Sequence, residues 1–344
     1  MPIVGGIDIH REQLTFDYVD TGTGEVRTGQ IRPADREHLR WWLGRHAAAG
    51  PEDMLAFEAC TGWRYVAEEI TRAGATALLA EPADTAAARG RKKRAKTDKA
   101  DARLLRVLAE RGQVPACWIP PGHVLEARAL LETYHDLRAE HTAWVQRIHA
   151  VLFHQGAPAV HGFTGPGGRQ QLERAAAAHL SPSGRRQVQA ALQMIDGLDE
   201  QLDDLRHELR AAAKRLKGAV ALQELWGVGP LTALALVCWL GGAGRFTSSR
   251  QAVRFTGLDI TVYSTGGKRT RGHLSRQGPP VLRWLLYEAG KTHGRAGHGS
   301  DHGYYAQVKE RSDGKRAALS EARKITRRAC HVLASLGDDA FTLV

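Results

Sequence analysis

Cysteine is scarce in this chain, and its spacing excludes two kinds of stabilising site. The 344 residues contain four cysteines, and no two of them form a CxxC pair: Cys60, Cys117, Cys238 and Cys330. Zinc ribbons and disulfide frameworks both need cysteines at close or regular spacings. We therefore expect neither, and we interpret the four thiols as small packing groups.

Long apolar segments are also missing. No stretch approaches the run of about 18 apolar residues that a membrane-spanning helix requires. The opening residues, MPIVGGIDIH, lack the charged and apolar regions of a signal peptide. The sequence therefore predicts a cytoplasmic protein without a membrane partner.

Positive charge, in contrast, is in excess. The chain carries 48 Lys and Arg against 37 Asp and Glu, which gives a net charge of +11 at pH 7. Such a balance favours an anionic polymer as partner, although it does not by itself separate DNA from RNA or from a membrane surface. The length suits two or three domains.

The first 118 residues alternate between strand and helix patterns. Three short β-type runs follow one another as a predicted meander: IVGGIDI, LTFDYVD and VRTGQI. Two helical patterns then alternate with the apolar runs DMLAFEAC and ATALLAEP. We predict an α/β domain over residues 1–118, with a mixed sheet and helices on its faces.

Long helices are predicted for residues 119–217. Apolar residues recur there at alternating steps of three and four, a heptad seam that includes Val188, Ile195, Leu202 and Leu209. Two such helices, separated by the Pro- and Gly-rich stretch near residues 156–168, favour either an antiparallel hairpin or an intermolecular coiled coil.

A mainly helical third region is predicted for residues 218–344. It begins with LWGVGPLTALALV, in which the GVGP turn is either a phosphate-binding helix-hairpin-helix element or an ordinary packing turn. The stretch HGRAGHGSDHGYY contains three histidines, and we expect a mobile surface loop there in preference to a metal site: His293, His298 and His302.

Two basic clusters are candidates for nucleic-acid binding. The first precedes a predicted helix and comprises Arg91, Lys92, Lys93, Arg94 and Lys96. The second lies in a segment rich in Gly, Ser and Thr, which is either a solvated loop or a phosphate-contacting one, and comprises Lys268, Arg269, Arg271 and Arg276. Contacts from such residues to a nucleic-acid backbone would make binding depend on salt.

Four acidic residues are candidates for one metal site. Asp8 lies within the apolar strand pattern GGIDI, and Glu58 ends the run DMLAFE. Asp98 and Asp101 are three apart at a helix start, so they share one face, although such a pair is also typical of a solvated first turn in which Asp98 is the N-cap. Four convergent carboxylates suit two Mg²⁺ ions, with Mn²⁺ as an alternative.

The order of these motifs resembles a known family. Asp8 in GIDIH, Glu58 in FEACTGWRY, and Asp98 with Asp101 in KTDKADARLL are similar to the DEDD signature of the insertion-sequence-110 transposases. The later LWGVGPLTALALV and FTGLDITVYSTGGKRTRGHLSRQG resemble that family's C-terminal transposase domain. The resemblance implies an N-terminal domain like RNase H and RuvC.

Activity and partners are further implications of the resemblance. It implies a recombinase that excises and inserts a mobile element, guided by a noncoding bridge RNA that pairs with target and donor DNA, and assembled as a tetramer. It also implies a serine nucleophile within VYSTGGK, for which we choose Ser264, with Thr265 as the alternative. No organic cofactor is expected.

Three other classes remain as alternatives. An actin-like or sugar-kinase-like ATPase also opens with such a strand, but it needs a Gly/Thr phosphate loop where this chain has HREQL. A RuvC-like junction nuclease would use metal-activated water and would not need Ser264. A noncatalytic nucleic-acid-binding protein is the third class.

Overall fold

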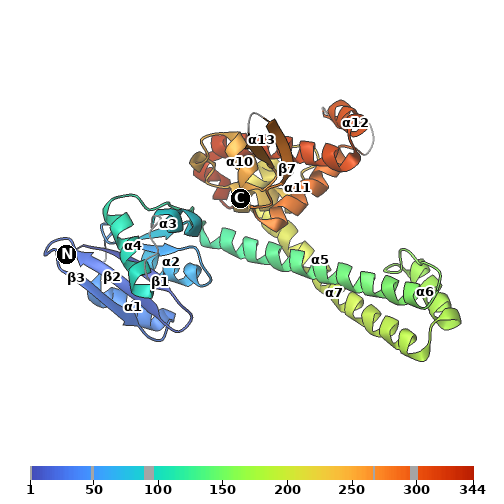
Figure 1. Cartoon of the computed structure of the whole chain (residues 1–344), viewed down its shortest axis with the longest axis horizontal. Helices are drawn as coiled ribbons and strands as arrows, with labels where there is room; N and C mark the ends of the chain where they lie inside the picture. The colour runs from blue at the N-terminus through green and yellow to red at the C-terminus, as the bar shows by residue number, and fades with distance from the viewer. Residues whose placement is uncertain (1, 48–49, 89–96, 266–267, 295–300) are drawn as a thin grey trace. The chain divides into compact units, whose positions relative to one another are not determined.

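The N-terminal part of the chain is built on a mixed β-sheet. A computed structural model describes residues 2–47, 50–88, 97–265, 268–294 and 301–344. The sheet has the strand order β3-β2-β1-β4-β5 and comprises β1 (Ile3–Ile9), β2 (Leu14–Asp20), β3 (Val26–Ile31), β4 (Met54–Glu58) and β5 (Thr76–Ala80). The first three strands pair antiparallel, and β4 and β5 run parallel to β1, so the predicted meander and mixed sheet are confirmed (Figure 1).

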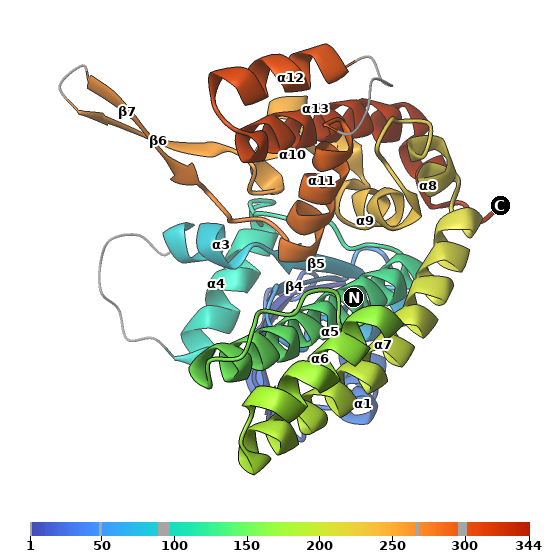
Figure 2. The same ribbon diagram turned by 90° about the vertical axis from the view of Figure 1, so that its right-hand side faces the viewer.

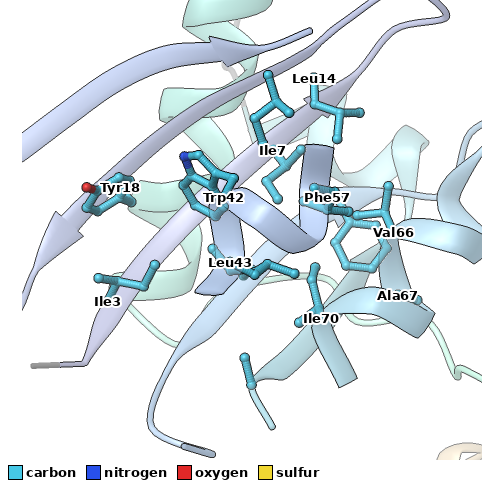
Figure 3. Close-up of a cluster of buried hydrophobic side chains, with 14 of the residues drawn as sticks. Ile3, Ile7, Leu14, Tyr18, Trp42, Leu43, Phe57, Val66, Ala67 and Ile70 are labelled. Atoms are coloured by element: carbon cyan, nitrogen blue, oxygen red, sulfur yellow. The ribbon is translucent and has the colours of Figure 1, made fainter. Parts of the chain in front are cut away.

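The main core of this unit lies on one face of the sheet. Ile3 and Ile7 of β1 point to that face, because side chains two residues apart share a side of a strand. They pack beneath α1 (Arg36–His46) and α2 (Trp63–Arg72), together with the fully buried Phe57 (Figure 3). The alternation of apolar residues in the strands therefore determines which face the two helices cover.

The opposite face is covered by α4 (Asp98–Glu110), which approaches β1 very closely at Gly6. A Cβ atom at Gly6 would lie 2.1 Å from the carbonyl oxygen of Ala102 and 2.6 Å from the amide nitrogen of Arg106. Both are backbone atoms, so they cannot move aside without shifting the helix. Glycine at this position therefore fixes the separation between α4 and the central strand.

Gly6→Ala is expected to destabilise the protein by about 3 kcal/mol or more, because the added methyl group displaces α4 from the sheet. Gly44→Ala is the matched control. Gly44 is exposed in α1 and has open space around it, so alanine should be neutral or stabilise by up to about 1 kcal/mol. Denaturant unfolding of both variants measures the difference, and equal stabilities would contradict this account of Gly6.

The second compact unit, Pro120–Val344, contains the long helices. Here α5 (Gly122–His154) and α7 (Pro182–Arg215) pack side by side, joined through α6 (Pro166–His179) (Figure 1). Val188 and Ile195 from the predicted seam are buried against Ile148 and Leu152 of α5. The long-helix hairpin is therefore confirmed as a contact within one chain.

The remaining helices form the C-terminal part of the same unit (Figure 2). They are α8 (Lys217–Leu222), α9 (Pro230–Leu240), α10 (Ser249–Phe255), α11 (Pro280–Thr292), α12 (His302–Arg311) and α13 (Gly314–Leu336), with short 3-10 turns at Ala243–Arg245 and Gly337–Phe341. In α9 every residue from Thr232 to Leu240 is buried, which makes it the central helix. The mainly helical character of this region is confirmed. A separate domain beginning at residue 218 stays a prediction.

The segment around Ser264 is not a loop. Residues Ile260–Thr265 form β6 and Lys268–Leu274 form β7, which pair antiparallel as a ribbon that extends beyond α10 and α12 (Figure 2). The expectation of a loop was wrong because the β-branched and aromatic residues in ITVYST favour a strand. Within the described residues, no helix is both long and apolar enough to cross a membrane.

Candidate active site

Two of the predicted acidic residues lie on neighbouring strands. Asp8 is near the end of β1 and Glu58 is the last residue of β4, one step beyond the paired residues Ile7 and Phe57. Because side chains alternate along a strand, Asp8 lies on the face of Gly6, and Glu58 lies on the face of Ala56. Both belong to the face that α4 covers, since Ala56 packs against that helix.

The other two acidic residues begin α4. Thr97 is the N-cap, and its hydroxyl oxygen accepts a hydrogen bond from the Ala100 amide at 3.2 Å. The prediction of Asp98 as N-cap is wrong by one residue, because threonine fulfils that role. Asp98 is therefore available to accept a hydrogen bond from the Gln13 side-chain amide at 3.1 Å, which joins α4 to the β1–β2 turn.

The electrostatic interactions of Asp8 show that the other three acids lie near it. Burial, followed by the negative charges of Asp98, Asp101 and Glu58, raises the pKa of Asp8 from 3.8 to about 6. All three carboxylates are thus within interaction range of Asp8. Mutual repulsion in a half-buried position is unfavourable, and a bound cation would relieve it. The residues present therefore fit a divalent metal, whose preferred ligands are carboxylate oxygens.

A buried ion pair positions α4, and the sequence analysis did not identify it. Asp17 of β2 is fully buried on the face of the sheet that α4 covers, where it accepts a hydrogen bond from Arg106 Nε and another from the Thr28 hydroxyl at 2.6 Å. Asp17 is paired with Gly6 in the antiparallel register. The ion pair and the glycine contact therefore hold the same part of α4. The alternation of β2 was the available signal, since it places an acid on a covered face.

Cys60 and His10 also lie near the acids. Burial, and then the charges of Asp8 and Glu58, raise the pKa of the half-buried Cys60 thiol. His10 has the opposite effect and lowers the pKa of Asp8. Each lies two positions after a predicted site residue. Cys60 was interpreted only as a packing thiol and His10 was not singled out, because a lone His or Cys has no distinctive pattern.

The structure describes only some of the remaining predicted site residues. Ser264 pairs with Arg269, and Thr265 pairs with Lys268, in the β6–β7 register, and Arg271 lies in the same ribbon. Arg276 is exposed just after β7. The first basic cluster lies outside the described residues: Arg91, Lys92, Lys93, Arg94 and Lys96. Their roles in binding stay predictions.

The GVGP turn packs against another helix. Gly227 has a positive φ of 82°, and a Cβ there would lie 2.5 Å from the Thr292 hydroxyl oxygen and 3.0 Å from the Ala289 carbonyl oxygen. Close packing on α11 thus explains the glycine. Phosphate binding by this turn stays a prediction.

His293 contradicts the expectation of a mobile surface loop. It lies directly after α11, and only 2% of its surface is exposed. The expectation was wrong for this residue because its neighbours in sequence are glycine-rich whereas its neighbours in space are the buried side chains of other helices. His302 begins α12, and His298 lies outside the described residues.

Two family models match this chain. A transposase model, for the DEDD transposases of IS110, matches residues 5–154, which contain the four acids. A second model, for the transposase IS116/IS110/IS902 family, matches residues 219–306, which contain Ser264. The two matches follow the same order along the chain as the motifs described above.

Similar proteins include several transposases. A transposase for insertion sequence element IS1111A from Coxiella burnetii is 27% identical over 96% of this chain and 86% of the relative. A probable family 20 transposase from Pseudomonas aeruginosa is 26% identical over 83% of this chain and 82% of the relative. A transposase for IS1328 from Yersinia enterocolitica is 27% identical over 73% and 74%, respectively.

Proposed function

Because this chain belongs to the IS116/IS110/IS902 family of transposases, we propose that it excises and inserts its insertion sequence under the guidance of a noncoding bridge RNA. Membership of the family implies DNA binding and indicates dependence on a divalent metal. The observation that carries the proposal is the convergence of four carboxylates around Asp8. Such a cluster suits phosphoryl transfer on a nucleic-acid backbone.

Asp8, Glu58, Asp98 and Asp101 would hold Mg²⁺, with Mn²⁺ as an alternative. When bound, the metal would supply a Lewis acid that stabilises negative charge on the phosphate oxygens. The protein's contribution is to keep the acids together. Gly6 and the Arg106–Asp17 pair hold α4 against the sheet, and Gln13 holds Asp98 at the start of that helix.

Ser264 is the proposed nucleophile. Its Oγ atom would form a bond to phosphorus as the bond from phosphorus to the DNA 3′-oxygen breaks, which leaves a 5′-phosphoserine and a 3′-hydroxyl. The serine proton must pass to a base, and the departing 3′-oxygen must gain a proton. Attack by another strand's 3′-hydroxyl would reverse the step and release the serine. This mechanism requires the two compact units to act on one DNA strand.

Base pairing by the RNA would select both DNA sites. The protein would then contact mainly the backbone and shape of the nucleic acids, which the net charge of +11 supports. Assembly as a tetramer, a dimer of dimers, belongs to the same proposal. The seam of α7 supports an assembly role, because Leu198, Leu205 and Ala212 are only partly covered in the chain.

Reconstitution of the reaction tests the proposal. Purified protein is combined with RNA transcribed from the flank of its element, matched target and donor DNA, and Mg²⁺, and junction products are then amplified. We expect recombinant junctions only in the complete mixture. Cleavage without RNA would favour a RuvC-like nuclease, whereas nucleic-acid binding without any cleavage would favour a noncatalytic binding protein.

Reversing the charge of Lys92, Lys93 and Arg94 to Glu is expected to weaken nucleic-acid binding and to flatten its dependence on salt. If each residue contacts one phosphate of duplex DNA, the slope of log K against log salt falls by up to about 3. Arg111→Glu, at the opposite end of α4, is the control. Titrations at several salt concentrations measure the slope, and an unchanged slope would show that this basic run is a solvated surface.

A further inference from the structure

Three buried side chains from the C-terminal helices point their ligand atoms at one place. His293 directly follows α11, Asp301 directly precedes α12, and Glu321 lies in α13; they are 2%, 7% and 0% exposed. One ligand atom from each lies within 4.8 Å of the others, and His293 Nδ1 is 4.0 Å from a carboxylate oxygen of Glu321. We call these residues the His293 cluster.

Two members of the cluster are buried without hydrogen bonds. Neither ring nitrogen of His293 and neither carboxylate oxygen of Glu321 has a hydrogen-bond partner in the part of the chain that the structure describes. The backbone of Trp226 is close enough to influence the pKa of His293, but it forms no hydrogen bond of ordinary geometry with the ring. Of these four atoms, Glu321 Oε1 has an ion-pair contact of 3.5 Å with Lys324, and the other three are left without a hydrogen bond. Buried polar atoms are rarely left unsatisfied, so this place requires a partner.

We propose that the His293 cluster binds one transition-metal dication of the Zn²⁺ type. One imidazole nitrogen and two carboxylates form a donor set that Zn²⁺ accepts and that Mg²⁺, which prefers oxygen alone, does not. Ligand atoms around tetrahedral zinc lie about 3.4 Å apart, so small side-chain rotations close the observed separations. Burial lowers the pKa of His293, which keeps the ring in the neutral form that binds metal.

Two cations already lie beside the acids. Lys324 Nζ is 3.2 Å from Asp301 Oδ1 and 3.5 Å from Glu321 Oε1, and Arg328 pairs with the other oxygen of Asp301. The lysine is partly exposed and lies over the Tyr304 ring. A metal ion must therefore displace the Lys324 ammonium group, whereas Arg328 can stay and orient Asp301 from outside the coordination shell. Lysine thus competes with the metal.

The location indicates what the metal would stabilise. It would join the end of α11 to the start of α12 and to α13. It would also lie beside the turn that leads into α9, because a Cβ at Gly227 would be only 3.2 Å from His293 Nε2. This site belongs to the second compact unit and shares no residue with the four acids around Asp8. The site does not depend on the proposed recombination.

Metal stoichiometry tests the proposal in the full-length chain. Chelator-treated protein is incubated with Zn²⁺ and separated from free metal, and its zinc content and unfolding temperature are measured. An Asp8→Asn and Asp101→Asn background weakens the other acidic site. We expect about one Zn²⁺ per chain in this background, loss of that ion in His293→Ala and Glu321→Gln, and retention in His331→Ala, which removes an exposed histidine of α13.

Lys324→Met gives a second test, which stays informative even if the His293→Ala and Glu321→Gln variants do not fold. Removal of the competing ammonium group should tighten Zn²⁺ binding by about tenfold or more. If the cluster is only an ion-pair network, the same variant lowers the unfolding temperature and gains no zinc. Absence of bound zinc in both the folded background protein and folded Lys324→Met would overturn the proposal, as would zinc that remains in folded His293→Ala.

Discussion

Asp8→Asn is expected to abolish DNA cleavage and, in metal-free protein, to raise the stability of the fold. Asparagine preserves the size of the side chain but removes a carboxylate from the centre of the four acids. Loss of one charged group that stabilises a transition state costs at least about 100-fold in rate. Asp8 is also a proposed metal ligand, so we expect an effect larger than this.

Asp8→Asn should increase the stability of the metal-free protein although it abolishes cleavage, because the Asp8 carboxylate is unfavourable in the folded state. Its pKa is raised from 3.8 to about 6, so the folded protein binds a proton more tightly than the unfolded chain does. The contribution of Asp8 to stability is therefore fully present below pH 3.8 and is lost as pH rises towards 6. With its partial exposure taken into account, Asp8→Asn should gain about 1 kcal/mol at pH 7.

Thermal unfolding with and without Mg²⁺ measures both effects. Wild type should gain stability from Mg²⁺ at pH 7.5 and gain less at pH 5, where protons compete for Asp8. Asp8→Asn should respond weakly at both pH values. Asp84→Asn, at an exposed position in α3 (Pro82–Ala88), is the matched control and should behave as wild type does. Normal DNA cleavage by Asp8→Asn would show that Asp8 is not part of the active site.

The faces on which the four acids lie could be predicted because each face depends on a local pattern. Alternation along β1 and β4 assigns Asp8 and Glu58 to one face, and the helical spacing of Asp98 and Asp101 assigns them to another. The close approach between these faces was not evident from local sequence. It depends on Gly6, which has no side chain, and on the pairing of Asp17 with Arg106, residues 89 positions apart.

Errors arose where neighbours in space outweigh neighbours in sequence. Glycines around His293 are typical of a surface loop, yet α13 supplies Glu321 and buries the histidine. The segment at Ser264 was expected as a loop because Gly, Ser and Thr are abundant, whereas pairing of β6 with β7 gives those residues a partner strand. The composition of a segment is an average over its residues, and it does not indicate which backbone groups form hydrogen bonds with each other.

Ser264→Ala is expected to eliminate a covalent protein–DNA adduct that Thr265→Ala retains. The alanine side chain has no oxygen that can form a bond to phosphorus, so the loss should be complete. Labelled DNA is incubated with protein, RNA and Mg²⁺, then separated on a denaturing gel with and without protease. A labelled, protease-sensitive band in wild type is the expected adduct.

The pair of variants also corrects the assignment if it is wrong by one residue. Both substitutions lie in β6 and remove one hydroxyl group, so a shared effect on the strand would reduce both adducts equally. Loss in Thr265→Ala alone would move the nucleophile to that residue. RNA binding by each variant, measured separately, shows that the protein is still folded and competent to assemble with its partner.

Cleavage by wild type without any adduct would point to water as the nucleophile. The distinction matters for the outcome of the reaction, because hydrolysis releases the energy of the phosphodiester bond. A phosphoserine conserves that energy, so a second strand's hydroxyl can rejoin the DNA without ATP. Asp8→Asn should form no adduct although Ser264 is intact, since in the proposed mechanism the metal and the serine act on the same phosphate. Normal adduct formation by Asp8→Asn would instead separate the serine from the acids.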